Sequence, residues 1–263
     1  MISLAIRLIK KRTEVCAGNN VFGWLNNISH RIIDFIFPAS CPLCGASVST
    51  HGELCADCWT AFNWIDGTKC HVCGRPLPDG LELGDTPMCS ECVAGNNALT
   101  ITRSACVYDD ASRAAVLPFK HVGKIQYGKF MAHAMIWALR DVDFVPDVVM
   151  PVPLATRRLR HRAYNQAALL AKPIARAYGA SIDYDSVHRK WREDMGHKNA
   201  RARAENIRGV FSVAHPKNIR GKTILLVDDV MTTGATFREL RRVLMRAGAV
   251  DVYGVTFCRV SRT

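Results

Sequence analysis

Two adjacent carboxylates followed by a run of hydroxyl residues form the clearest chemical pattern in this sequence. Asp228 and Asp229 come directly after Thr223 to Val227, a short apolar, β-branched run typical of a strand buried in a parallel sheet. A small, hydroxyl-rich loop follows and leads into a helical pattern of apolar residues: Thr232, Thr233, Gly234, Ala235 and Thr236. Free amides at a helix N-terminus bind phosphate, and nearby carboxylates can accept hydrogen bonds from sugar hydroxyls. The pattern therefore predicts a sugar-phosphate ligand.

A simpler interpretation is that Asp228 and Asp229 only solvate the end of a strand and that Thr232 caps a helix. The string ILLVDDVMTTGAT, however, resembles the phosphoribosyl pyrophosphate (PRPP) signature of type I phosphoribosyltransferases. The resemblance implies that Asp228 and Asp229 hold the ribose hydroxyls, that the loop 232–236 holds the 5-phosphate, and that Mg²⁺ accompanies PRPP. The residue that would activate an acceptor stays unknown.

Eight of the eleven cysteines fall in four C-x-x-C pairs, the spacing of metal ligands. The pairs lie between residues 41 and 92: Cys41 and Cys44, Cys55 and Cys58, Cys70 and Cys73, Cys89 and Cys92. Four thiolates surround one zinc ion tetrahedrally, so the segment predicts two structural zinc sites in a duplicated ribbon. Sequential pairing puts the first four cysteines on one ion and the last four on the other, and a cross-braced arrangement is the alternative.

A basic loop follows a second predicted strand, 147–153, and enters a helix. It contains four arginines, Arg157, Arg158, Arg160 and Arg162. In type I phosphoribosyltransferases the corresponding loop faces the pyrophosphate, so the resemblance makes these arginines candidates for that contact. The string Arg162-Ala163-Tyr164-Asn165-Gln166 resembles the RGFNQ motif of the ComF/GntX family, phosphoribosyltransferase-like proteins with an N-terminal zinc ribbon. Ala163 departs from the family's glycine.

The order of these motifs predicts three regions in the 263 residues. Residues 1–37 would form an extension with an amphipathic helix over 21–37, residues 38–95 a double zinc ribbon, and residues 96–263 an α/β domain. The resemblance implies a type I phosphoribosyltransferase-like parallel sheet with helices on both faces. Residues 183–189 predict a further strand, and the polar, basic segment 188–206 is either a loop that closes over PRPP or a surface linker.

Charge and composition narrow the possible partners. Residues 1–95 hold 7 Lys and Arg against 9 Asp and Glu, whereas residues 96–263 hold 28 against 14. A basic domain suits a polyanion such as PRPP or a nucleic acid. No apolar run reaches the length of a membrane span, and the metal-spaced cysteines favour the reducing cytoplasm.

Two functions follow from the resemblance and stay open on sequence alone. In the first, the chain binds PRPP and Mg²⁺ and acts in natural competence or DNA utilisation, contacting single-stranded DNA and a DNA-translocating ATPase. In the second, it is an active phosphoribosyltransferase that transfers phosphoribose from PRPP to an unidentified acceptor.

Overall fold

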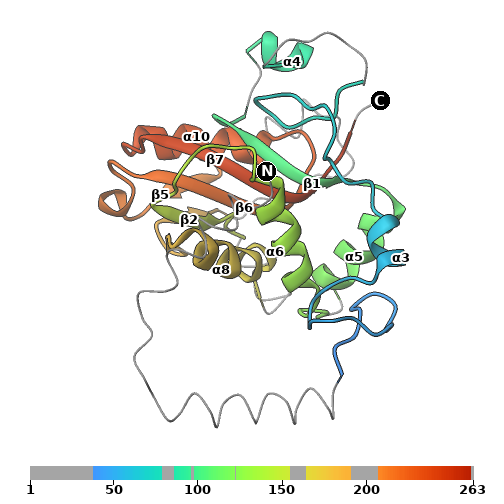
Figure 1. Ribbon diagram of the computed structural model, residues 1–263. Coiled ribbons are helices and arrows are strands. Elements are labelled where there is room, and N and C mark those ends of the chain that lie inside the picture. The colour runs from blue at the N-terminus through green and yellow to red at the C-terminus, as the bar shows by residue number, and fades with distance from the viewer. Residues whose placement is uncertain are drawn as a thin grey trace, which may run out of the picture. The chain divides into compact units, whose positions relative to one another are not determined.

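The structure, a computed structural model, describes residues 38–78, 86–95, 98–121, 123–154, 164–190 and 207–261 (Figure 1). Its backbone divides into two compact units, Met1–Trp59 and Thr60–Thr263. The helix predicted over 21–37 lies outside the described residues. None of the helices in the described ranges combines the length and the hydrophobicity that crossing a bilayer requires.

A five-stranded parallel sheet forms the centre of the unit Thr60–Thr263, in the spatial order β1, β7, β6, β2, β3. The strands are β1 (Thr102–Val107), β2 (Val148–Pro151), β3 (Ser181–Ile182), β6 (Thr223–Met231) and β7 (Asp251–Arg259). The apolar run predicted as a buried strand lies in the central strand β6, where Ile224 to Val227 are fully buried. The parallel α/β sheet predicted from the sequence is confirmed.

Helices cover both faces of the sheet, as Figure 1 shows. Helices α6 (Tyr127–Ala138) and α8 (Gln166–Tyr178) pack on one face together, and α5 (Asp110–His121) lies against α6. Helix α10 (Ala235–Arg246) contacts β7 and covers the other face. Its buried side includes Phe237, Leu240 and Leu244, which repeat at helical spacing.

The connections reverse direction between β2 and β6. From β2 the chain passes through α8 to β3 on one side, and from β6 it passes through α10 to β7 on the other. Open α/β sheets bind ligands at such a reversal, beyond the carboxyl ends of the strands. A ligand site in this sheet is therefore expected next to the carboxyl end of β6.

The strand predicted over 183–189 is confirmed only for its last three residues, and residues 183–186 form a turn. Asp183 directly follows β3, and its Oδ1 accepts hydrogen bonds from the backbone N–H groups of Asp185 (3.0 Å) and Ser186 (2.8 Å). This side-chain turn breaks the extended chain. The chain then enters β4 (Val187–Arg189), which pairs antiparallel with β5 (Phe211–Val213).

The free edge of β1 is covered by a segment that precedes the second group of cysteines. The N–H of Ile65 donates to the Ala105 carbonyl (2.9 Å), and Asn63 accepts from the N–H of Val107 (2.9 Å). Phe62 is buried against the rings of Phe130 and Phe257. Covering the edge leaves fewer unpaired backbone N–H and C=O groups on β1.

Three short helices complete the described elements: α3 (Ala56–Thr60), α4 (Ser90–Val93) and the 3₁₀ turn η2 (Pro216–Asn218).

Candidate functional site

The two predicted acids lie inside β6 and not after its end. Pairing between β6 and β7 continues to Met231 opposite Arg259, whereas pairing with β2 ends at Val227 opposite Pro151. Asp228 and Asp229 therefore occupy a stretch that is hydrogen-bonded on one side only, at the carboxyl edge of the sheet. Successive strand residues point to opposite faces. Asp228 is half-buried and Asp229 is 6% exposed.

Lys120, in the last turn of α5, forms an ion pair with Asp229. The Lys120 Nζ lies 3.0 Å from the Asp229 Oδ1, and the two side chains are 20% and 9% exposed. A pair this shielded from water is stronger than a surface pair, because solvent screens it less. The sequence showed Lys120 only as a basic residue near a helix end, without its partner.

The environment of the pair alters the ionisation of Asp228. Burial and the neighbouring charge of Asp229 raise the pKa of Asp228 to about 7, while Lys120, the N–H of Asp229 and Arg189 oppose that rise. Arg189 ends β4, so the antiparallel pair β4–β5 brings a second cation near the acids. The sequence did not single out Arg189.

The predicted phosphate loop turns at Gly234, the N-cap of α10. Gly234 has φ +67°, a conformation that side-chain-bearing residues rarely adopt, and the Thr233 Oγ1 accepts a hydrogen bond from the N–H of Ala235 (3.4 Å). A Cβ at Gly234 would also lie 3.2 Å from the Ala98 side chain. Around it, Thr233 and Thr236 are half-buried, Thr232 is exposed, and Ala235 is buried. The first turn of α10 thus offers backbone amides at the same edge as the acids.

Another contact fixes the chain that leads into β5. The N–H of Gly209 donates to the Glu239 Oε1 of α10 (2.6 Å), and Glu239 also accepts from the Arg242 guanidinium at 2.5 and 2.7 Å. Residues 191–206, most of the predicted closing loop, lie outside the described residues, as do Arg157, Arg158, Arg160 and Arg162.

The cysteines form two separate clusters with sequential membership. Within each cluster the four sulfur atoms all lie within 4.8 Å of one another. The first cluster contains Cys41, Cys44, Cys55 and Cys58, and the second contains Cys70, Cys73, Cys89 and Cys92. The Sγ atoms of Cys44 and Cys55 are 3.5 Å apart, and those of Cys73 and Cys89 are 3.7 Å apart. A tetrahedral zinc with ligands at about 2.3 Å separates its sulfurs by about 3.8 Å. The clusters fit two structural zinc ions, and the sequential pairing is confirmed over the cross-braced one.

The second cluster is bound to the sheet through its first turn. Thr102 donates its N–H to the Val72 carbonyl (2.8 Å), and the Arg103 Nη1 donates to the His71 carbonyl (2.9 Å). Arg259, at the end of β7, donates to the Cys73 carbonyl. Among the described residues, two cysteines lie outside the clusters, Cys106 and Cys258; both are buried in the sheet, and burial raises the pKa of both.

Comparisons with known proteins agree with both parts of this structure. Residues 32–93 match the family described as "Double zinc ribbon domain", and residues 131–262 match "Phosphoribosyl transferase domain". The chain is 29% identical over 232 residues to the DNA utilization protein YhgH of Salmonella typhi, covering 84% of this chain and 97% of that protein. It is 26% identical over 213 residues to the Competence protein ComFC of Bacillus subtilis, covering 79% and 84%. The chain belongs to the ComF family.

Among solved structures, this ComF-family chain resembles the glutamine PRPP amidotransferase of B. subtilis, with a TM-score of 0.37 and 19% identity. The likeness covers 59% of this chain and 31% of that one.

The described part of the segment that resembles the ComF motif, residues 164–166, donates side-chain hydrogen bonds to three backbone carbonyls near the acid pair. The Tyr164 hydroxyl donates to the Phe119 carbonyl (2.6 Å), and the Gln166 side chain donates to the Lys120 carbonyl (3.1 Å). The Asn165 side chain donates to the Val152 carbonyl (3.2 Å) and accepts from the N–H of Ala167, capping α8. The motif therefore holds the end of α5 that carries Lys120 and the end of β2.

Proposed function

We propose that this ComF-family chain binds PRPP together with Mg²⁺ at the carboxyl end of β6. The observation that carries the proposal is the position of the acid pair and the Gly234 loop, which share the sheet edge where the connections reverse. Asp228 and Asp229 would accept hydrogen bonds from the ribose hydroxyls. The amides of the loop 232–236 and the first turn of α10 would hold the 5-phosphate.

The residues present fit a magnesium-bound ligand. Carboxylate oxygens are donors that Mg²⁺ prefers, usually through bound waters, and Asp228 and Asp229 supply them. Bound with PRPP, Mg²⁺ would offset the negative charge of the pyrophosphate. Arg157, Arg158, Arg160 and Arg162 remain our candidates for the pyrophosphate side. Lys120 would hold the Asp229 side chain in place before the ligand arrives.

Calorimetric titration with PRPP and Mg²⁺ tests the site. We expect the double variant Asp228→Asn/Asp229→Asn to lose binding, and Asp143→Asn, an exposed acid away from β6, to keep it. Absence of PRPP binding by the wild-type chain, or its survival in the double variant, would refute the proposal.

The raised pKa of Asp228 gives the same titration a pH signature. The ionised carboxylate accepts hydrogen bonds at both oxygens and attracts a cation, whereas the protonated form has lost the charge, and burial together with Asp229 raises the pKa of Asp228 to about 7. Affinity for PRPP and Mg²⁺ should therefore rise between pH 6 and pH 8, by up to about tenfold. With Asp228→Asn, whatever affinity remains should change much less over this interval.

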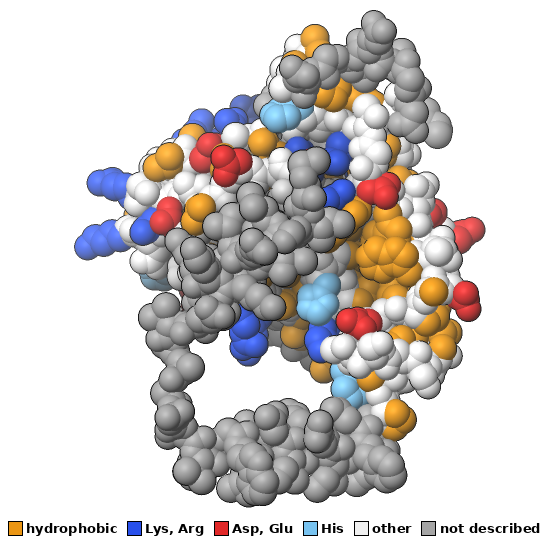
Figure 2. Space-filling view, viewed as in Figure 1, with side chains coloured by type: hydrophobic (Ala, Val, Ile, Leu, Met, Phe, Trp, Pro, Cys, Tyr) orange, Lys and Arg blue, Asp and Glu red, His pale blue; other side chains and the backbone are white. Residues whose placement is uncertain are grey.

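We further propose that the PRPP site serves DNA uptake or utilisation in the cytoplasm, with single-stranded DNA and a DNA-translocating ATPase as partners. The names of the relatives support this role, and so does the charge of the described surface. Helix α10 carries four arginines beyond its buried side, Arg238, Arg241, Arg242 and Arg246. Figure 2 shows Lys and Arg side chains gathered on the side where β5 and α10 lie. The zinc ribbon is our candidate surface for the ATPase.

Fluorescence anisotropy with a labelled single strand tests the DNA part. Each arginine that contacts a phosphate steepens the salt dependence, with a slope of about −0.7 per contact on a single strand. Arg238→Gln/Arg246→Gln should weaken binding and flatten that slope. Lys172→Met, on α8 across the sheet, is the matched control and should change neither. Negligible binding at physiological salt would refute the DNA contact.

Transfer of phosphoribose is the second candidate function, favoured by the complete acid-and-loop string from Asp228 to Thr236. In that reaction the anomeric carbon bond to pyrophosphate breaks and a bond to the acceptor forms. Release of pyrophosphate that depends on an added acceptor would establish turnover. Binding of PRPP without release of pyrophosphate would instead favour the first proposal, in which the chain binds PRPP and acts in DNA uptake or utilisation.

A further inference from the structure

The last carbonyls of α5 are held by side chains from a distant segment. A helix leaves its last four carbonyls without partners inside the helix. In α5 the Tyr164 hydroxyl donates to the Phe119 carbonyl (2.6 Å). The Gln166 amide donates to the Lys120 carbonyl (3.1 Å). The backbone on both sides of Lys120 is therefore fixed by residues that lie 45 and 46 positions further along the chain.

The same segment is attached to the strands beside the acid pair. The Asn165 side chain donates to the Val152 carbonyl (3.2 Å), and the N–H of Val152 donates to the Val227 carbonyl (2.9 Å), one residue before the acids. The Lys120 Nζ closes this ring of contacts at the Asp229 Oδ1 (3.0 Å). Both the backbone and the side chain of Lys120 are thus held against the carboxyl end of β6.

Lys120 keeps hydrogen-bonding capacity beyond its pair with Asp229. An ammonium group has three N–H donors, and 20% of the Lys120 side chain is exposed. The ring of contacts ties Lys120 to Val152, where β2 has ended and the sequence continues into the loop with the four candidate arginines. Helix α10, our candidate for the 5-phosphate, covers the other face of the sheet. Of the two anionic ends of PRPP, the pyrophosphate is therefore the one on the side of Lys120.

We propose that Lys120 binds the pyrophosphate of PRPP and that Tyr164 and Gln166 are positioning residues that hold it there. Lys120 bridges the Asp229 carboxylate and a pyrophosphate oxygen, and a cation between two like-charged groups offsets their repulsion. Tyr164 and Gln166 act on the ligand only through Lys120. The inference rests on the proposed PRPP site and adds to it a binding residue and the two residues that place it.

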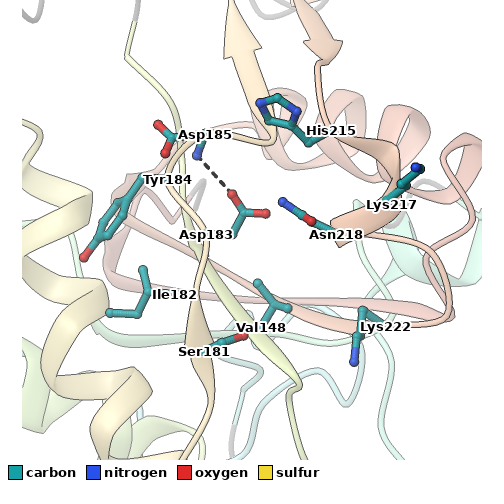
Figure 3. Close-up of a pocket in the computed structure, with 10 residues that line it drawn as sticks. All are labelled: Val148, Ser181, Ile182, Asp183, Tyr184, Asp185, His215, Lys217, Asn218 and Lys222. Carbon is teal, nitrogen blue, oxygen red and sulfur yellow. Dashed lines mark hydrogen bonds between the residues drawn. The ribbon is translucent and has the colours of Figure 1, made fainter.

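A lysine at the opposite edge of the sheet provides a matched reference. Lys222 directly precedes β6 and pairs with Asp147 (4.0 Å), but both side chains are 46% exposed. Figure 3 shows Lys222 among the residues that line a pocket beside β3. Exposed ion pairs hold their side chains weakly, whereas shielded pairs are hard to break. Lys222 therefore reports effects that do not come from the acid pair.

Limited acetylation of the full chain, measured at each lysine by mass spectrometry, tests the positioning without PRPP. Relative to Lys222, Lys120 should react about fivefold faster in Tyr164→Phe/Gln166→Met than in wild type, since two hydrogen bonds of the ring are lost. Tyr253→Phe removes a hydroxyl bond near the amino end of β7 and should leave the ratio unchanged. An unchanged ratio in the double variant overturns the positioning role. If the double variant does not fold, Tyr164→Phe alone decides.

Calorimetry with two ligands tests the pyrophosphate contact. PRPP and ribose 5-phosphate share the ribose and the 5-phosphate, but only PRPP carries pyrophosphate. With Mg²⁺ present, Lys120→Met should weaken PRPP by about tenfold more than ribose 5-phosphate, because hydrogen bonds to charged groups are worth at least that factor. Lys120→Arg should restore part of the loss, and Lys222→Met should change neither affinity. Equal losses for both ligands would mean that Lys120 acts only through Asp229 and would overturn the contact.

Combined variants separate positioning from general destabilisation. Tyr164→Phe should weaken PRPP relative to ribose 5-phosphate by about threefold in the wild-type background. In the Lys120→Met background it should have almost no further effect, because a positioning residue acts only through the residue that it places. The same loss in both backgrounds would indicate a purely structural role and contradict the proposal.

These outcomes are distinct from failure of the PRPP site itself. If the wild-type chain binds no PRPP, the proposed function and the pyrophosphate contact fail together. The acetylation experiment needs no ligand, so it still decides whether Tyr164 and Gln166 place Lys120 against the acid pair.

Discussion

The two cysteine clusters have the same ligands and the same knuckle turn, yet they differ in their surroundings. In the first, Cys44 is exposed and Cys55 and Cys58 are half-buried, within the compact unit Met1–Trp59. In the second, Cys70, Cys89 and Cys92 are buried, and carbonyls of the turn bind Thr102, Arg103 and Arg259 of the sheet strands. A duplicated metal motif can therefore support its own module in one copy and brace a neighbouring sheet in the other.

Removing one ligand from each cluster is the strongest test of this difference. Cys70→Ser should lower the melting temperature of the sheet by on the order of 10 °C or more, because zinc binding contributes directly to folding. Cys41→Ser should lower it by less than about 3 °C. Hydrogen exchange of the β6 amides during heating reports on the sheet alone. Zinc analysis should show one ion lost in both variants, and equal melting shifts would contradict the comparison.

The buried arginine of β1 tests the link between cluster and sheet without touching a zinc ligand. Arg103 is 3% exposed and pairs with Asp141 (3.0 Å) while it holds the His71 carbonyl. Arg103→Met leaves the His71 carbonyl without its side-chain donor and leaves Asp141 paired with Lys69 alone (3.3 Å). It should cost about 2–3 kcal/mol of unfolding free energy. Arg75→Met, which breaks the more exposed pair with Glu91, should cost at most about 1 kcal/mol. Urea denaturation measures both, and a similar loss in the two variants would contradict this account.

The knuckle glycines make a closely matched pair with a smaller effect. Gly45 and Gly74 have φ of +81° and +66°, so alanine at either position costs about 1–2 kcal/mol in backbone strain. A Cβ at Gly74 would also lie 2.7 Å from the Thr102 carbonyl oxygen, whereas at Gly45 it would meet no described heavy atom within 4 Å. Gly74→Ala should therefore destabilise the sheet by about 1–3 kcal/mol more than Gly45→Ala. If sheet stability measured in urea is equal for the two variants, the turn of the second cluster does not press on β1.

Local patterns predicted the parts of the fold that depend on neighbouring residues. The C-x-x-C spacing predicted both clusters, and the apolar run 223–227 predicted the centre of β6, since both features are set within a few residues. The length of β6 was decided by a distant segment. The strand β6 continues through Asp228 and Asp229 because β7 pairs with it to Met231, which no local pattern contains.

Contacts between distant segments could not be predicted for the same reason. Lys120 meets Asp229 only because the sheet brings the first crossover beside the central strand, and Arg189 approaches only through the pairing of β4 with β5. The turn at Asp183 is different, because its two side-chain bonds are local. An aspartate followed closely by another polar turn residue is a known turn signal, and it was available in the sequence.

The smallest effect expected is on ligand binding, and it decides how far the influence of the first cluster extends. The acid pair and the Gly234 loop belong to the unit Thr60–Thr263, and the first four cysteines belong to the other unit. Loss of the first zinc should therefore leave the affinity for PRPP and Mg²⁺ within about twofold, a free-energy change of about 0.4 kcal/mol. Calorimetry on Cys41→Ser beside wild type, at a temperature where both are folded, measures it. A tenfold loss would mean that the first ribbon takes part in the PRPP site, and the contrast between the clusters would then be one of degree.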